Sequence, residues 1–137
     1  MILDASAIVK LLLEESGSDL AEACVERSLE AGEEVASVDI ALAEALNALW
    51  KHAAVVRDLD EGGFREAASE LLSFWERLEV ISTRELAPDA VKLALEEGIT
   101  VHDALYLAAA ARRMTKLATF DERLREAARR RSIPVCP

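Results

Sequence analysis

Carboxamide side chains are almost absent from this chain of 137 residues, which contains no glutamine and a single asparagine, Asn47. Aromatic residues are also scarce, at 4% of the sequence, so alanine, leucine and valine must fill the core that its 52% of hydrophobic residues can form. Charged residues, by contrast, reach 31%. Many charges combined with few carboxamides are typical of proteins from hot environments.

No apolar run approaches the roughly 18 residues of a membrane-spanning helix, and the first residues lack the layout of a signal peptide. We therefore expect a cytoplasmic protein without membrane contact. Cys24 and Cys136 match no metal-binding or redox spacing, and we expect two reduced, partly buried thiols. No Gly-rich phosphate loop is present, so a nucleotide-binding function has no support.

Positive charge is in deficit, because 16 Lys and Arg face 26 Asp and Glu, for a net charge of −10. Proteins that coat nucleic acid by neutralising phosphates are usually basic, so that class is excluded. Contact with a phosphodiester would require bound cations or a local basic rim, and a protein partner is expected to be basic. Eight basic residues are candidates for such a rim: Lys10, Lys51, Arg112, Arg113 and Lys116, with Arg129, Arg130 and Arg131 near the C-terminus. The alternative for each of them is a solvated surface charge.

Short apolar segments alternate with helical patterns along the whole chain. Strands are predicted at residues 1–4, 34–37, 80–81, 116–119 and 133–135. Helices are predicted at residues 7–13, 19–30, 39–56, 64–78, 88–97, 102–114 and 121–131, with a break at Gly62-Gly63 and with Pro88 in a first turn. This alternation predicts one domain over residues 1–137, of α/β class: a three-layer α/β/α sandwich with a parallel sheet of four to five strands.

Four acidic residues stand in apolar surroundings. Asp4 ends the first strand, Asp121 follows a later one, and Asp103 opens a buried helix. Glu44 projects from another apolar helix, with Asn47 three residues further on the same face. Ligands of open α/β sheets bind beyond the carboxyl ends of the strands, so we expect the four carboxylates to share one pocket. Such a cluster requires a hard cation, and ligation by oxygen alone suits Mg²⁺ or Mn²⁺.

Each acid also has a purely structural interpretation. Asp4 and Asp121 stand where helix N-caps belong, and residues 100–103 fit a capping box. Capping and metal binding are compatible, because a helix start directs its first acids toward the strand ends. Glu44 lies in the middle of a helix, and its structural alternative is a buried ion pair with Lys10 or an arginine.

Four of these segments together resemble the signature motifs of the PIN domain family, and in particular the VapC-type toxins of toxin–antitoxin pairs. They are Asp4-Ala-Ser6, Glu44-x-x-Asn47, Val101-His-Asp103-Ala-Leu-Tyr-Leu-Ala and Thr119-Phe-Asp121. Each motif is weak by itself. The four in the family's order and approximate spacing are specific, and they cover essentially the whole chain.

The resemblance implies an endoribonuclease that depends on Mg²⁺ or Mn²⁺, which would activate water for in-line attack on phosphorus. It implies catalytic and metal-binding roles for Asp4, Glu44, Asp103 and Asp121. It implies supporting roles, orienting carboxylates or water, for Ser6, Asn47 and Thr119. The implied partners are an RNA substrate, a cognate antitoxin and a second copy of the chain in a homodimer.

Two other functions were weighed against this one. A non-catalytic PIN-like module whose acidic pocket receives a basic partner remains an alternative. A phospho-accepting receiver domain is excluded, because the chain has Asp4 alone where an acidic pair is required and Lys116 stands at the wrong end of its strand. His102 either assists proton transfer beside Asp103 or occupies a surface position. Ser6 has no neighbouring histidine and is expected to be a structural hydroxyl.

Overall fold

The computed structural model describes residues 1–137, and its centre is a parallel sheet. The strands are β1 (Ile2–Leu3), β2 (Ala36–Val38), β3 (Glu79–Ile81), β4 (Leu117–Ala118) and β5 (Val135–Cys136). Their order is β3-β2-β1-β4-β5, and all neighbouring pairs are parallel. The prediction of a parallel sheet of four to five strands is therefore confirmed.

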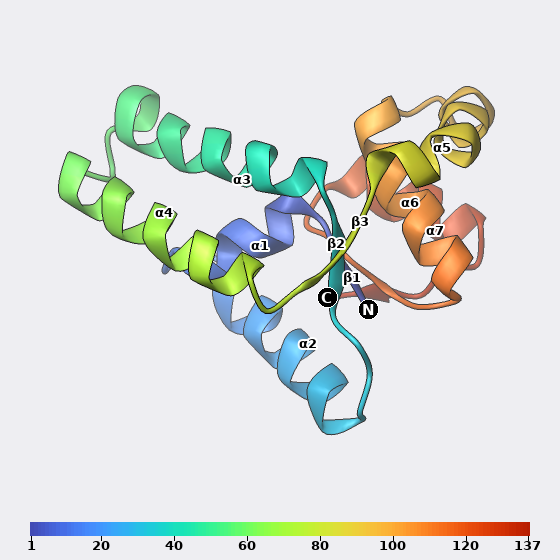
Figure 1. Ribbon diagram of the computed structural model, residues 1–137, viewed down its shortest axis with the longest axis horizontal. Coiled ribbons are helices and arrows are strands. Elements are labelled where there is room, and N and C mark those ends of the chain that lie inside the picture. Colours follow the sequence, from blue (N-terminus) through green and yellow to red (C-terminus); the bar gives the residue numbers. More distant parts are fainter.

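Helices cover both faces of this sheet, which Figure 1 shows nearly edge-on between the two layers. One layer contains α1 (Ala5–Leu12), α2 (Ser18–Glu30), α3 (Ile40–Lys51), which continues into a π-helical segment (His52–Val56), and α4 (Glu61–Trp75). The other contains α5 (Thr83–Glu97), α6 (Val101–Arg113) and α7 (Glu122–Arg130). The three-layer α/β/α sandwich is confirmed.

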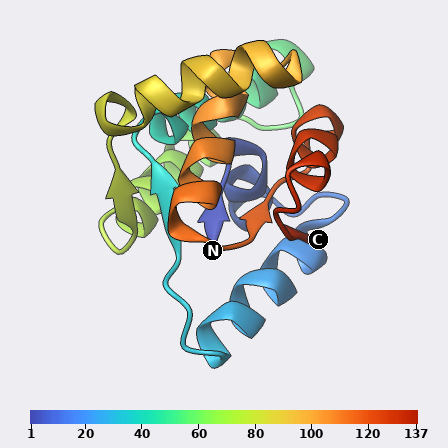
Figure 2. The same ribbon diagram turned by 90° about the vertical axis from the view of Figure 1, so that its right-hand side faces the viewer.

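Helix α6 is the most deeply buried element. All side chains from Ala104 to Ala110 are buried, because α6 lies against the sheet while α5 runs across its upper end (Figure 2). Small alanines at four of these positions allow that close approach. The first turn of α6 therefore has a fixed place relative to the strands, and it carries Asp103.

Two predicted helix starts were wrong. The Gly62-Gly63 pair does not separate two elements but lies in the first turn of α4, where Asp60 is the N-cap and accepts from Gly63 N at 2.7 Å. Helix α5 begins five residues before Pro88, because Ser82 caps it and accepts from Arg84 N. Local capping outweighed the glycine and proline signals in both places.

Helices α2 and α3 leave large apolar side chains exposed to solvent. On α2 the buried side chains are the small ones, Ala21, Cys24 and Ser28, whereas the large Leu20 and Leu29 are more than half exposed. On α3 Asn47 is exposed, and so is half of the surface of Trp50. The apolar run around Glu44 is thus only partly buried, and Asn47 requires no buried partner.

The expectation of two reduced cysteines is contradicted. Cys24 on α2 and Cys136 on β5 form a disulfide across 112 residues of sequence. Spacing gave no signal for it, because the two thiols meet only after the sheet has placed β5 beside β4. No helix is both long and apolar enough to cross a membrane.

Candidate active site at the carboxyl edge of the sheet

Asp4 lies at the centre of the carboxyl edge of the sheet, directly after the middle strand β1, and is 4% exposed. It is the N-cap of α1, since its Oδ1 accepts from Ala7 N at 2.8 Å. Ser6 Oγ donates to the same carboxylate at 2.7 Å, and Thr119 Oγ1 donates to Oδ2 at 2.5 Å. Three donors therefore fix this buried carboxylate from three sides.

These hydrogen bonds do not fully compensate the Asp4 carboxylate for its loss of hydration. Burial raises the pKa of Asp4 to about 6, against the opposing effect of the bonds from Thr119, Ala7 and Ser6. The nearby charge of Asp121 raises this pKa further. The ionised form of Asp4 is thus costly in the folded protein, and a cation beside it would relieve that cost.

Ser6 and Thr119 link Asp4 to the loop after β4. Ser6 Oγ accepts from Phe120 N at 2.9 Å, and Thr119 Oγ1 accepts from Asp121 N at 3.0 Å. Each hydroxyl thus receives a backbone hydrogen bond and passes its own hydrogen to Asp4. The two side chains hold β1 and β4 in register at the edge where Asp121 emerges.

Glu44 is reached from α6 by two side chains that belong to one helix face. Tyr106 Oη donates to Glu44 Oε2 at 2.5 Å, and His102 Nδ1 lies 3.0 Å from Oε1. Burial raises the pKa of Tyr106, and the bond to Glu44 and the charges of Glu44 and Asp4 raise it further, so the phenol stays a neutral donor. The structural alternative for Glu44, an ion pair with Lys10 or an arginine, is not found, and Lys10 pairs with Glu15 instead.

Asp103 and Asp121 occupy helix starts, as their structural interpretations required. Thr100 is the N-cap of α6: its Oγ1 accepts from Asp103 N at 3.1 Å and donates to Asp103 Oδ2 at 2.8 Å. Asp121 is the N-cap of α7 and accepts from Leu124 N at 3.0 Å. Asp121 is exposed, and Asp103 is half-buried.

The structure brings the acids to one edge without closing a metal site. The charge of Asp121 raises the pKa of Asp4, and the charge of Asp4 raises the pKa of Tyr106, the hydrogen-bond donor to Glu44, so these side chains lie near one another. No group of three or more His, Cys, Asp and Glu side chains has the spacing to hold an ion. Like charges repel, and here each carboxylate takes a hydroxyl, imidazole or backbone donor instead. The donor set of hard oxygens nevertheless fits Mg²⁺ or Mn²⁺ in its chemistry.

Sequence reasoning missed Tyr106, although one signal was available. It is the only tyrosine of the chain, and its hydroxyl is the only polar side-chain group between Ala104 and Ala110. It follows Asp103 by three residues and His102 by four, which places all three on neighbouring positions of one helix face. A buried hydroxyl in such a segment needs an acceptor from elsewhere in the fold.

The basic residues offered for a rim are mostly engaged elsewhere. The ion pairs are Lys10–Glu15, Arg112–Glu85, Arg112–Asp89, Arg113–Glu79 and Lys116–Glu33. Arg113 and Lys116 precede β4 and so lie at the amino edge of the sheet, opposite Asp4. Arg130 and Arg131 pair with Glu97. Lys10 also contacts the loop after β4, with its Nζ 4.9 Å from the ring centre of Phe120.

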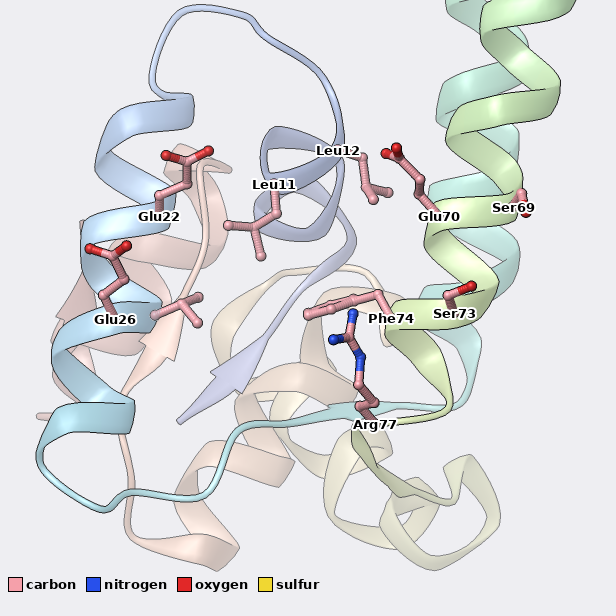
Figure 3. A pocket seen from close by; sticks show the side chains of 10 residues that line it. Leu11, Leu12, Glu22, Glu26, Ser69, Glu70, Ser73, Phe74 and Arg77 are labelled. Carbon is pink, nitrogen blue, oxygen red and sulfur yellow. The ribbon is translucent and has the colours of Figure 1, made fainter.

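A groove of about 450 Å³ opens on another face, between α2 and α4 over α1 (Figure 3). Leu11, Leu12, Val25 and Phe74 line its floor, and Leu11 and Phe74 point into the space between the two helices. Its polar lining consists of Glu22, Glu26, Ser69, Glu70, Ser73 and Arg77. A second hollow of about 540 Å³ shares Val25, Phe74 and Arg77 and adds Leu29, Val35 and Leu78. This α2–α4 groove is an apolar surface with a mainly acidic rim.

The fold is a five-stranded parallel sheet in an α/β/α sandwich with acids at its carboxyl edge, and the model of the PIN domain family matches residues 1–130. The chain belongs to this family. It is 38% identical to "Ribonuclease VapC3" of Pyrobaculum aerophilum over 128 residues, which cover 92% of each chain.

Solved structures show the same fold. PAE2754 from Pyrobaculum aerophilum is 26% identical with a TM-score of 0.66, and the match covers 92% of this chain and 77% of that one. VapBC2 from Rickettsia felis, bound to a promoter DNA fragment, is 18% identical with a TM-score of 0.67 over 98% of this chain and 95% of that one. FitAcB from Neisseria gonorrhoeae is 19% identical with a TM-score of 0.64, and the match covers 98% of this chain and 94% of that one.

Proposed function

We propose that this protein is a metal-dependent endoribonuclease and the toxin of a toxin–antitoxin pair. The observation that carries the proposal is Asp4, a buried carboxylate at the carboxyl edge of the sheet that lacks a compensating cationic side chain. The similarity to a protein named a ribonuclease over 92% of both chains supports the same activity. An RNA substrate in turn implies that the protein works in the cytoplasm.

The proposed ligands of Mg²⁺ or Mn²⁺ are Asp4, Glu44, Asp103 and Asp121. A bound ion would supply Lewis acidity to the attacking water and to the leaving oxygen. The chain's own residues hold the carboxylates: Ser6 and Thr119 fix Asp4, while Tyr106 fixes Glu44. Because Asn47 is exposed, its supporting role is proposed only for contact with substrate.

The activity is tested by cleavage of a mixed RNA pool in Mg²⁺ or Mn²⁺. Asp4→Asn and Asp103→Asn are each expected to abolish cleavage and to leave the circular dichroism spectrum unchanged. Asp60→Asn is a matched control, because Asp60 is also an N-cap but stands at the far end of α4 from the sheet (Figure 1). Cleavage retained by both site variants would refute the proposal.

We propose that the antitoxin binds in the α2–α4 groove. The groove has an apolar floor, and its rim carries Glu22, Glu26 and Glu70 on a protein of net charge −10. This surface suits an amphipathic segment with basic flanks. Solved structures with the same fold include a toxin–antitoxin complex from Klebsiella pneumoniae, at 20% identity and a TM-score of 0.61. Phe74→Asp should abolish binding of the cognate antitoxin while the RNA cleavage of the free toxin persists.

The homodimer is also a proposal. Val91 and Leu95 lie one turn apart on α5 and expose 53% and 82% of their surface, and Val101 exposes 47% at the start of α6. Large exposed apolar side chains of this kind are typical of association surfaces. Light scattering coupled to gel filtration should give the mass of two chains, and Leu95→Glu should reduce it to one.

A further inference from the structure

Glu44 is contacted by two side chains of α6 that differ sharply in exposure. Tyr106, which is 2% exposed, donates to Oε2, whereas the side chain of His102, 61% exposed, contacts Oε1. The two side chains lie four residues apart on α6 and therefore on the same face, with Asp103 between them in the sequence. Oε2 thus has a partner shielded from water, while the partner of Oε1 can be exchanged at the surface.

The Tyr106 hydroxyl has no role in packing. The ring lies among the apolar side chains of α6, where phenylalanine would fill almost the same volume. A buried hydroxyl costs free energy unless it is hydrogen-bonded, and its acceptor here lies 62 residues away on another helix. Besides an interaction with the Ala5 backbone, the hydroxyl gives the Glu44 carboxylate a fixed direction relative to α6 and Asp103.

We propose that Tyr106 is a positioning residue that orients Glu44 as a ligand for a divalent cation, leaving Oε1 as the oxygen that changes its partner when the ion binds. This inference rests on the proposed function. The same geometry assigns His102 the role of a temporary partner in the metal-free protein, because its exposed side chain can turn away without leaving a buried group unpaired.

The first experiment compares the Mn²⁺ dependence of thermal unfolding in wild type and Tyr106→Phe, both stripped with EDTA and dialysed. Binding to the folded state raises the melting temperature by mass action, so the rise reports affinity without any need for a substrate. Losing the partner that orients a ligand typically weakens metal binding by about 10- to 100-fold. We expect the Mn²⁺ concentration that produces a given rise to increase by roughly that factor in Tyr106→Phe.

Two further variants separate positioning from stability. Ser28→Ala removes another fully buried hydroxyl, which donates to Cys24 O on α2, and it should lower the baseline melting temperature without changing the Mn²⁺ dependence. Glu44→Asp keeps the charge but withdraws the carboxylate from Tyr106, so it should show the same weakened response and serves as the test if Tyr106→Phe does not fold.

A double-mutant cycle tests whether Tyr106 acts through Glu44. Glu44→Gln and Glu44→Gln/Tyr106→Phe should show the same residual Mn²⁺ response. An additional loss in the double variant would overturn the inference, as would a Tyr106→Phe response equal to that of wild type, while the proposed function would stand in both cases. A wild type that neither responds to Mn²⁺ nor cleaves RNA would overturn both.

Discussion

Replacing Asp4 with asparagine should stabilise the metal-free protein at neutral pH. Burial raises the pKa of Asp4 from 3.8 to about 6, which corresponds to a cost of about 3 kcal/mol for the ionised form at about 1.4 kcal/mol per pKa unit. Asparagine is as good an N-cap as aspartate, so the bond to Ala7 N can be kept, but its amide nitrogen cannot accept the hydrogen bond that Thr119 donates to Oδ2, and this loss offsets part of the gain. We therefore expect the free energy of unfolding in EDTA at pH 7.5 to increase by up to about 3 kcal/mol.

The pH dependence of this difference follows from linkage. Because the pKa of Asp4 is higher in the folded than in the unfolded state, the folded state retains a proton between pH 6 and 3.8 that the unfolded state has lost. The cost of Asp4 is therefore fully present above pH 6 and disappears as the pH falls to 3.8. The advantage of Asp4→Asn over wild type should shrink over the same range and vanish near pH 4.

Urea unfolding followed by circular dichroism, in EDTA at pH 7.5, 6 and 4.5, measures this difference directly. Groups other than Asp4 titrate in both proteins, so only the gap between the two free energies is informative. Saturating Mn²⁺ should reverse the order at pH 7.5, since the ion stabilises wild type more than the variant. A variant less stable than wild type at pH 7.5 in EDTA, or a gap independent of pH, would refute the reasoning.

Three further changes have expected outcomes in thermal unfolding. Thr119→Val removes the donor to Asp4 and should cost about 1–3 kcal/mol, while Thr119→Ser should cost clearly less; equal losses would contradict a role for the hydroxyl. Gly17→Ala should cost at least about 1–2 kcal/mol, because Gly17 has a φ of +94° and a Cβ there would lie 2.9 Å from the Phe120 ring; an unchanged melting temperature would contradict this. Cys24→Ser opens a loop of 112 residues and should cost up to about 5 kcal/mol, an effect that dithiothreitol should reproduce in wild type but not in the variant.

The architecture was largely readable from the sequence. Alternating apolar segments and helical patterns predicted the parallel sheet and its two helix layers, because both periodicities are local. The acids could also be placed in part. Asp4 directly follows the buried strand β1, Asp121 stands three residues after the end of β4, and Asp103 opens a helix, so each had to lie near the carboxyl edge. Helix boundaries failed at Gly62-Gly63 and Pro88, where capping by Asp60 and Ser82 decided the start.

Which face of each helix is buried could not be predicted from the periodicity of the sequence. The sequence did not reveal that α2 packs through the small Ala21, Cys24 and Ser28 and leaves the larger Leu20 and Leu29 more than half exposed. The pattern within one helix does not reveal how closely the next element approaches. A close approach selects small side chains and leaves the large ones outside, with Leu29 lining the second hollow beside the α2–α4 groove, and the exposed Asn47 on α3 reflects the same limit.

The sequence by itself determined the class of fold, the edge at which the acids gather and the capping roles of three of them, because these depend on neighbours a few residues away. Only the tertiary structure decided which groups stabilise those acids. The partner of Glu44 is Tyr106, 62 residues distant, that of Asp4 is Thr119, 115 residues distant, and that of Cys24 is Cys136, 112 residues distant. Such contacts arise from the packing of α6, β4 and β5 around β1, and no local periodicity encodes them.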